Sequence, residues 1–194
     1  MKILLIGADG QLGTELQKTI IAKELIPLTI NDIDITDKEK TIRVIGAHKP
    51  DVIINTAAYH RVDDCENNDL PAFMVNAIGV KNLCMACNAV DAKFVHISTD
   101  YVFDGDKKSP YIESDVPAPQ TVYGISKLAG EYYMRYMLKK YILIRSSGIF
   151  GAAGCMASGG LNFVEVMLKL AKEKGQVSVV NDQIVSPTYA FDLA

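Results

Sequence analysis

A tyrosine and a lysine, Tyr123 and Lys127, lie four residues apart in the sequence. If this segment is helical, both side chains lie on one face of the helix. A free phenol has a pKa of about 10, which is high for proton transfer near neutral pH, and a nearby ammonium would lower it. The pair could therefore transfer a proton in catalysis. The alternative is a solvated tyrosine beside an ordinary surface lysine, so the pair alone does not decide the function.

Three glycines follow an apolar segment at the start of the chain. Residues 3–6 favour a strand, Gly7, Gly10 and Gly13 come next, and residues 14–17 favour a helix. Such a turn brings backbone N–H groups and the positive end of the helix dipole close to a pyrophosphate. The spacing G-x-x-G-x-x-G differs from the common dinucleotide fingerprint, and a plain glycine turn is the alternative interpretation.

A third group of polar residues follows a buried-looking strand. Residues 94–98 are mostly apolar, and Ser98, Thr99 and Asp100 stand at the end of this run, with Thr99 24 residues before Tyr123. Ligands of open parallel sheets bind beyond the carboxyl ends of the strands. We therefore expect these hydroxyls and this acid to emerge where a substrate binds.

Taken together, these segments resemble the extended short-chain dehydrogenase/reductase family. Within it, the sequence is most similar to the dTDP-4-dehydrorhamnose reductases, and the similar pieces follow the family's order along the whole chain. The matching pieces are the three glycines, Asn55-Thr56-Ala57-Ala58-Tyr59, Val75-Asn76-Ala77, Ser98-Thr99-Asp100-Tyr101, Tyr123 with Lys127, and Ser186-Pro187-Thr188.

The resemblance implies an activity: NAD(P)H-dependent reduction of the 4-keto group of a nucleotide-activated deoxysugar. The product, dTDP-L-rhamnose or a close analogue, would serve the synthesis of cell-surface polysaccharide precursors. Tyr123 would donate the proton, Lys127 would lower the pKa of Tyr123 and hold the nicotinamide ribose, and Thr99 would hydrogen-bond the carbonyl. Asp100 and Tyr101 would contact the sugar, with capping or packing at a strand end as the alternative.

The implied cofactor is NADPH or NADH. The choice stays open, because residues 29–31 carry neither the acid nor the arginine that marks each cofactor, and Asp32 is expected to begin a loop. The implied cofactor contacts are Gly7, Gly10, Gln11, Leu12, Gly13, Asp34, Ile35, Ala57, Ala58 and Tyr59, together with Tyr123 and Lys127.

Strand and helix signals alternate along the chain. This alternation predicts an α/β fold with a doubly wound, Rossmann-like parallel sheet. Strands are expected near 2–6, 26–30, 51–55, 92–98 and 141–146, and helices near 11–24, 37–48, 70–89, 121–139 and 161–174, followed by a short strand near 177–180 and a helix from Thr188.

The chain divides into two regions in this interpretation. Residues 1–150 form the NAD(P)-binding domain, and residues 151–194 begin the substrate-binding region. Because the sequence stops within an expected helix, we expect most of the substrate lobe to be missing. Residues 151–160 are long and glycine-rich for a strand-to-helix connection, and we interpret them as a substrate-side loop.

Composition excludes several partners. The net charge of −3, without a basic stripe, argues against nucleic acid and against an anionic membrane. There is no uninterrupted apolar run of 18 residues and no leader pattern, so a cytoplasmic location is predicted. A nucleotide-sugar substrate is the expected partner, and the sequence is compatible with a homodimer.

No metal site is predicted. Cys84 and Cys87 form a C-x-x-C pair, but they fall within an expected helix and no second ligand pair follows at the spacing of zinc sites. His48, His60 and His96 lack such neighbours in the sequence and are interpreted as structural.

Three other functions remain as alternatives. The first is reduction of a different sugar, because Gly148 stands where the reductases tend to carry a tryptophan. The second is an epimerase or dehydratase of the same fold, which Tyr101 disfavours because dehydratases carry a glutamate at that position. The third is a non-catalytic NAD(P)-binding regulatory subunit of the methionine adenosyltransferase beta type. The intact set of Thr99, Tyr123 and Lys127 favours an enzyme.

Overall fold

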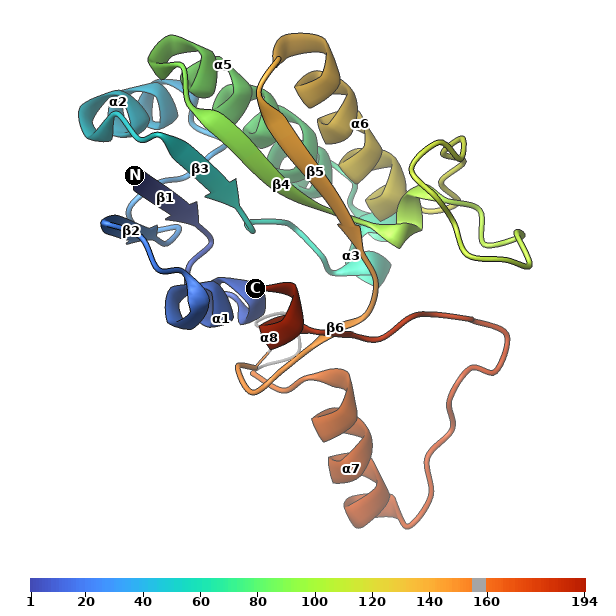
Figure 1. Ribbon diagram of the computed structural model, residues 1–194. Helices are drawn as coiled ribbons and strands as arrows, with labels where there is room; N and C mark the ends of the chain where they lie inside the picture. Colours follow the sequence, from blue (N-terminus) through green and yellow to red (C-terminus); the bar gives the residue numbers. More distant parts are fainter. Residues whose placement is uncertain (155–159) are drawn as a thin grey trace.

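A five-stranded sheet forms the centre of the computed structural model, which describes residues 1–154 and 160–194. Every pairing in this sheet is parallel, so all of its strands end at one edge (Figure 1). The strand order is β2-β1-β3-β4-β5, formed by β1 (Lys2–Ile6), β2 (Glu24–Leu28), β3 (Val52–Asn55), β4 (Lys93–Thr99) and β5 (Tyr141–Ser146).

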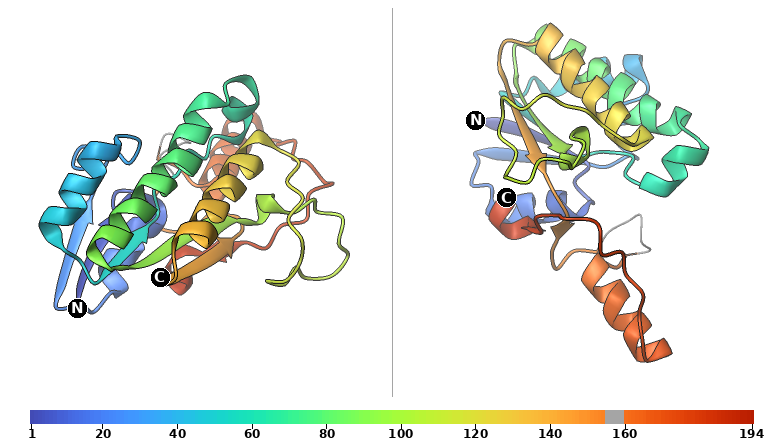
Figure 2. Two further views of the ribbon diagram at one scale, coloured as in Figure 1. Left: turned by 90° about the horizontal axis from the view of Figure 1, so that it is seen from above. Right: turned by 90° about the vertical axis from the view of Figure 1, so that its right-hand side faces the viewer.

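Helices cover both faces of the sheet. On one face lie α2 (Lys38–His48), α5 (Val80–Val90) and α6 (Val122–Met137), and on the other lie α1 (Gln11–Thr19) and the short α8 (Ala190–Leu193), as Figures 1 and 2 show. Side chains alternate between two apolar clusters, with Leu4 and Ile53 in the first and Leu5 in the second. The predicted doubly wound α/β fold is confirmed.

The first crossover is shorter than predicted. Helix α1 ends at Thr19 instead of continuing to residue 24, and β2 begins at Glu24 instead of residue 26. The pairing register explains the early strand, because Lys2 is already opposite Glu24 and the two strands run side by side from there. Pro27 is tolerated since β2 is an edge strand of this sheet.

The predicted helix over residues 70–89 contains a π-helical turn. It is formed by α4 (Leu70–Phe73), the π-helical η1 (Met74–Gly79) and α5. Helix α6 packs closely on this turn, because a Cβ atom on Gly130 would lie 2.2 Å from the carbonyl oxygen of Asn76. Such turns occur often at functional sites.

The helix from Leu70 to Val90 is by length and composition apolar enough to cross a membrane. Its position gives another reason for this composition. It lies between α2 and α6, and 56% of its most apolar window is buried inside the molecule. We therefore interpret it as a core helix.

Several short elements were not predicted. They are α3 (Val62–Asn67), the 3₁₀ turn η2 (Asp100–Val102), and a separate parallel pair formed by β6 (Ile149–Phe150) and β7 (Thr188–Tyr189). The expected strand near 177–180 is wrong, because these exposed residues have no paired neighbour within the described chain. The helix expected from Thr188 begins at Ala190, since Thr188 and Tyr189 pair with β6.

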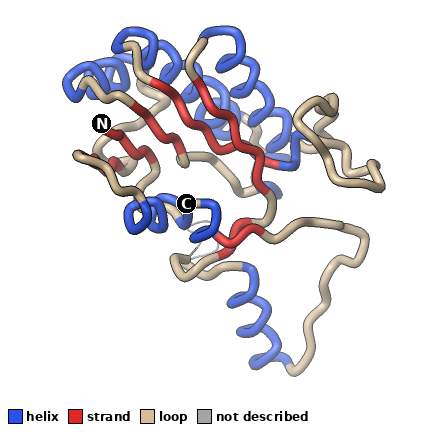
Figure 3. Tube along the Cα trace, in the orientation of Figure 1, coloured by secondary structure: helices blue, strands red, loops and turns tan. Residues whose placement is uncertain are grey.

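The last part of the chain leaves the sheet and returns to it. Helix α7 (Phe163–Lys174) begins with a capping box between Asn162 and Glu165, contains no buried residue, and extends away from the sheet (Figure 3). The chain then returns, and α8 packs on α1 with Ala190 fully buried. The division of the chain at residue 150 stays a prediction.

Candidate active site

The carboxyl edge of the sheet brings three of the predicted segments together. The glycine turn follows β1, residues 56–59 follow β3, and Thr99 ends β4. The chain moves from β1 to β2 on one side and later to β3 on the other, so the topological switch point lies between β1 and β3. Ligands of doubly wound sheets bind at such a point.

The turn after β1 is held in a shape that requires glycine. Gly7 has a φ of +78°, and a Cβ atom there would lie 2.7 Å from the Ala57 nitrogen. The N–H of Gly7 donates to the Leu28 carbonyl at 3.0 Å. The Thr56 hydroxyl donates to the Ile6 and Gly7 carbonyls at 2.9 and 3.0 Å. The turn is thereby fixed to β2 on one side and β3 on the other.

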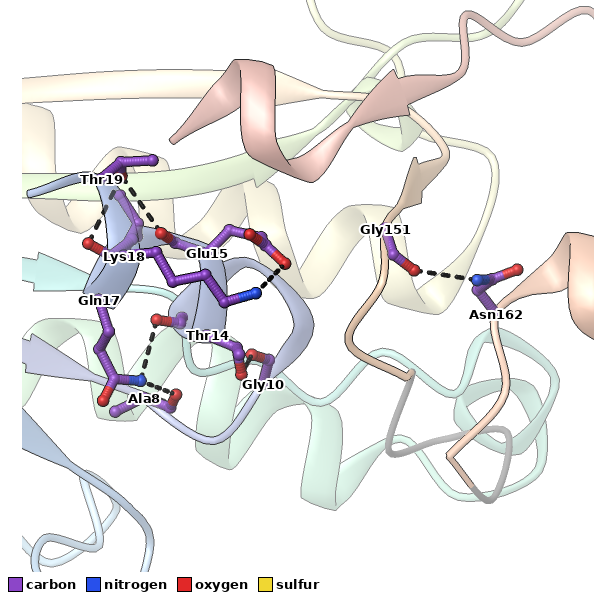
Figure 4. Close-up of polar contacts among 11 residues, drawn as sticks. Ala8, Gly10, Thr14, Glu15, Gln17, Lys18, Thr19, Gly151 and Asn162 are labelled. Atoms are coloured by element: carbon purple, nitrogen blue, oxygen red, sulfur yellow. Dashed lines mark hydrogen bonds and ion pairs between the residues drawn. The ribbon is translucent and has the colours of Figure 1, made fainter.

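Helix α1 begins at this turn without a side-chain cap. Its N-cap is Gly10, and no acid occurs in its first turn. The Gln17 side-chain amide donates to the Ala8 carbonyl at 2.7 Å and so links α1 to the glycine turn (Figure 4). The Gln11 Nε2 atom is buried without a hydrogen-bond partner among the described residues. A helix N-terminus without a side-chain cap, beside a buried amide nitrogen that has no partner, is suited to binding a dinucleotide pyrophosphate.

The segment after β2 is ordered by its own hydrogen bonds. The Asp32 carboxylate accepts hydrogen bonds from the Thr29 nitrogen at 2.8 Å and from the Thr29 hydroxyl at 2.9 Å. These bonds lower the pKa of Asp32 and hold its carboxylate within the turn. The Asp34 carboxylate likewise accepts from Thr36. The Ile35 side chain is buried against Gly79. If Ile35 contacts the adenine ring, its backbone must therefore make the contact, because its side chain is buried.

Asn76, in the π turn, connects the segment after β3 to helix α6. Its Oδ1 atom accepts from the Tyr59 nitrogen at 2.9 Å, and its Nδ2 atom donates to the Tyr59 carbonyl at 2.8 Å. The same Nδ2 donates to the Ser126 hydroxyl at 3.0 Å, which in turn donates to the Tyr123 carbonyl at 2.7 Å. Sequence reasoning assigned no role to Asn76 or Ser126, because a π turn has no recognisable sequence signal.

The start of α6 is fixed by two caps and one glycine. The Thr121 hydroxyl accepts from the Gly124 nitrogen at 3.0 Å, and Glu66 of α3 accepts from the Val122 nitrogen at 2.8 Å. A Cβ atom on Gly124 would lie 2.3 Å from the Tyr101 carbonyl oxygen. Glycine beside Tyr123 therefore lets η2 pack directly against the helix that carries the phenol.

Thr99, Asp100, Tyr101 and Tyr123 lie close together in the structure. The rings of Tyr101 and Tyr123 meet edge to face with centroids 5.5 Å apart, and the Thr99 side chain is near enough to Tyr123 to lower the pKa of its phenol in part. The Thr99 hydroxyl also donates to Asp100 at 3.1 Å and accepts from the Tyr101 nitrogen at 3.2 Å. Thr99 therefore caps η2, a role that the sequence analysis considered only for Asp100 and Tyr101.

The predicted lowering of the Tyr123 pKa is wrong for this structure. Burial raises the pKa of Tyr123 to about 12, and the Thr99 hydrogen bond opposes this only in part. Lys127 is 2% exposed, and its Nζ atom donates to the Ile97 carbonyl at 2.7 Å. Burial also lowers the pKa of Lys127 to about 8, against the opposing influence of Glu131. Desolvation is the largest cause of both pKa shifts, and it acts against the lowering of the Tyr123 pKa that the sequence spacing suggested.

Glu131, one turn beyond Lys127, anchors a buried ionic network that the sequence analysis missed. Its carboxylate accepts from Arg145 Nε at 3.0 Å and Nη2 at 2.6 Å, and from the Ser98 hydroxyl at 2.6 Å. The Arg145 guanidinium lies over the Phe103 ring, 4.9 Å from its centroid. The network joins α6, β4 and β5 beneath the candidate site. A glutamate on the helix face of Tyr123 and Lys127 was the available signal.

Comparison with known proteins now decides the family. A family model described as the RmlD substrate binding domain matches residues 1–194. The chain belongs to this family. The spore coat polysaccharide biosynthesis protein SpsK of Bacillus subtilis is 43% identical over 195 residues, which are 100% of this chain and 67% of SpsK. A dTDP-4-dehydrorhamnose reductase of Burkholderia thailandensis is 40% identical over 100% of this chain and 63% of its own length.

A solved structure agrees with this result. The dTDP-4-dehydrorhamnose reductase of Bacillus anthracis, crystallised in complex with NADP, has a TM-score of 0.92 and 42% identity. The match covers 100% of this chain and 68% of that one. The chain thus spans about two thirds of the length of such RmlD-family relatives.

The surroundings of Gly148 leave space for a side chain. Gly148 has a φ of +43°, and a Cβ atom there would meet nothing closer than Pro187 at 3.7 Å. Position 148 therefore has room for a side chain, although its backbone conformation disfavours one. The middle of the predicted substrate-side loop 151–160 lies outside the described residues, at 155–159.

The C-x-x-C pair is not placed for metal or redox chemistry. Cys84 and Cys87 are fully buried in the apolar core of α5, and burial raises the pKa of the Cys84 thiol to about 12 and that of Cys87 further. In the described parts of the chain no three potential ligands among His, Cys, Asp and Glu cluster together.

Proposed function

We propose that the protein reduces the 4-keto group of a dTDP-activated 6-deoxysugar with NADPH or NADH, as a dTDP-4-dehydrorhamnose reductase does. The observation that carries this proposal is the grouping of Thr99, Tyr101 and Tyr123 at the carboxyl edge of the sheet, the edge at which the glycine turn follows β1. The names of the relatives support it, and so does the NADP in the B. anthracis structure.

The glycine turn and the segments around it would hold the cofactor. When bound, NADPH supplies a hydride for the carbonyl carbon. Gly7, Gly10 and Gly13 would leave the pyrophosphate free access to the first amides of α1, at Gln11 and Leu12. Ala57, Ala58 and Tyr59 would extend this surface from β3, and Asp34 and Ile35 would border the adenine end.

Tyr123 would give the carbonyl oxygen its proton. A pKa of about 12 keeps the phenol protonated at physiological pH, and an alkoxide is basic enough to take that proton. Thr99 would hydrogen-bond the same oxygen. Lys127 lies one helical turn away, where Cβ atoms are about 5–6 Å apart, so its charge would stabilise the phenolate as it forms.

Asp100 and Tyr101 would contact the sugar from η2. This arrangement disfavours elimination of water, because Tyr101 offers a hydroxyl where a dehydratase needs an acid. The regulatory-subunit alternative predicts cofactor binding without turnover, and this difference separates it from the reductase.

Replacing Gly10 by valine should weaken NADPH binding without unfolding the protein. Gly10 has an ordinary φ of −75°, and its Cβ atom would lie 3.2 Å from the Gly7 carbonyl oxygen, so the turn must shift by a few tenths of an ångström to accept a side chain that would block phosphates. Titration followed by NADPH fluorescence measures the effect. Gly46→Val, in α2 with nothing within 4 Å, is the matched control and should bind normally. Equal affinity in both variants would exclude the turn from the site.

The activity itself is tested by NADPH absorbance with dTDP-4-dehydro-L-rhamnose. A reductase should oxidise one NADPH for each sugar reduced, whereas an epimerase returns its cofactor unchanged. If no nucleotide ketosugar consumes NADPH or NADH although the cofactor binds, the regulatory-subunit alternative is favoured.

A further inference from the structure

Three buried polar side chains form a row beneath the candidate site. Asn55 on β3 and His96 on β4 are 0% exposed, and Lys127 on α6 is 2% exposed. Asn55 Nδ2 lies 3.1 Å from His96 Nδ1, and His96 Nε2 lies 3.5 Å from Lys127 Nζ. The row joins the loop after β3 to the lysine on the phenol-bearing helix. Sequence analysis gave His96 no more than a structural role.

The contacts of Asn55 determine which ring nitrogen of His96 carries the hydrogen. The Ala57 backbone nitrogen donates to Asn55 Oδ1 at 3.1 Å, and a backbone N–H can only donate. The amide oxygen of Asn55 therefore faces Ala57, and its NH₂ group faces His96 Nδ1. That nitrogen must accept, so in a neutral ring the hydrogen is on Nε2. The N–H of His96 then faces Lys127.

We propose that Asn55 holds His96 in the Nε2–H tautomer and that His96 thereby acts as a positioning residue for Lys127, giving its amine a hydrogen-bond donor and disfavouring the ammonium. The amine then donates one of its own hydrogens to the Ile97 carbonyl at 2.7 Å. Only the role assigned to Lys127 in catalysis rests on the proposed function, because the tautomer follows from the contacts alone.

The charges around the row agree with this assignment. Burial and Lys127 keep the pKa of His96 well below its usual value, so the ring is neutral. Among the groups that face Lys127, Glu131 favours the ammonium, but Arg145 and Arg135 also pair with that carboxylate. Tyr123 stays protonated and adds no negative charge. An N–H of His96 facing Lys127 adds to the desolvation that favours the neutral amine.

Nitrogen NMR of histidine tests the tautomer directly. The chain contains three histidines, and long-range proton–nitrogen correlation distinguishes a protonated ring nitrogen from a bare one. We expect His96 to show a bare Nδ1 and a protonated Nε2 across the neutral pH range. The His96→Leu variant assigns the signal, and if it does not fold, His48→Gln and His60→Gln assign the other two. A protonated Nδ1 in the native protein would overturn the proposal.

The Asn55→Asp variant should reverse the tautomer. One carboxylate oxygen would still accept from the Ala57 nitrogen, and the other would accept from a protonated His96 Nδ1. His96 would then present a lone pair to Lys127, and the pKa of Lys127 should rise by about 1 unit or more. An unchanged His96 spectrum in folded Asn55→Asp would contradict the mechanism.

The pH profile of reduction supplies a second readout. Activity should fall as pH rises through about 8, where Lys127 loses its proton in the native protein, and Asn55→Asp should move this loss to higher pH. His48→Gln, at the end of α2, should leave the profile unchanged. An unmoved profile with a reversed tautomer would overturn the link to Lys127. If the protein has no reductase activity, the NMR measurement of the His96 tautomer is still valid. The two experiments therefore distinguish failure of the proposed function from failure of the tautomer proposal.

Discussion

Replacing Tyr123 by phenylalanine should abolish reduction while leaving NADPH affinity nearly unchanged. The variant loses only the hydroxyl, because the ring keeps its edge-to-face contact with Tyr101. Loss of a general acid typically costs about 10²–10⁴-fold in rate. Steady-state kinetics and fluorescence titration of NADPH measure the two effects separately.

The same helix offers a matched control. Tyr136 is 89% exposed on α6, so Tyr136→Phe should change neither rate nor affinity. If Tyr123→Phe retained most of the activity, the proton would have to come from another group, and Asp100 would be the next candidate.

Replacing Glu131 by alanine should destabilise the protein strongly. The substitution leaves the Arg145 guanidinium, which is 13% exposed, without its bidentate partner and leaves the buried Ser98 hydroxyl without an acceptor. Breaking a buried ion pair typically lowers the free energy of unfolding by about 3–5 kcal/mol. Urea unfolding followed by circular dichroism measures the loss.

A glutamate outside any network provides the comparison for Glu131. Glu173 is exposed on α7, and its replacement by alanine should change the free energy of unfolding by no more than about 0.5 kcal/mol. A similarly small effect of Glu131→Ala would mean that solvent or other side chains compensate for the lost carboxylate. Glu131→Ala should also lower the pKa of Lys127, because the Glu131 carboxylate favours the ammonium form of that lysine.

The central sheet was predictable because its strands are short apolar runs between helical segments. β1 and β5 have the predicted limits, and β3 and β4 differ by one residue at their ends. The glycine turn was predictable for the same local reason, because it directly joins the apolar run of β1 to the helical segment of α1. Local patterns carry this information.

Features that depend on tertiary partners were not predictable from the sequence. The pair β6–β7 joins residues nearly 40 positions apart, and two-residue strands have no periodic signal. The amino-acid composition of the π turn does not distinguish it from an ordinary α-helix, yet this turn places Asn76 between Tyr59 and Ser126.

The chemical state of the candidate site was the least predictable feature. The spacing of Tyr123 and Lys127 indicated the correct helix face. The raised pKa of the phenol, however, depends on burial, which residue spacing does not reveal. The same limit applies to His96, whose neighbours Asn55 and Lys127 are remote in the sequence.

Transfer of deuterium tests the proposed reaction most directly. The protein would be incubated with dTDP-4-dehydro-L-rhamnose and NADPH labelled with deuterium at C4 of the nicotinamide on the transferred face, and the sugar would be analysed by proton NMR. We expect one deuterium at C4 of the product sugar for each NADPH oxidised, and none in the Tyr123→Phe variant. Consumption of NADPH without deuterium at sugar C4, or sugar conversion without net NADPH oxidation, would contradict the reductase assignment.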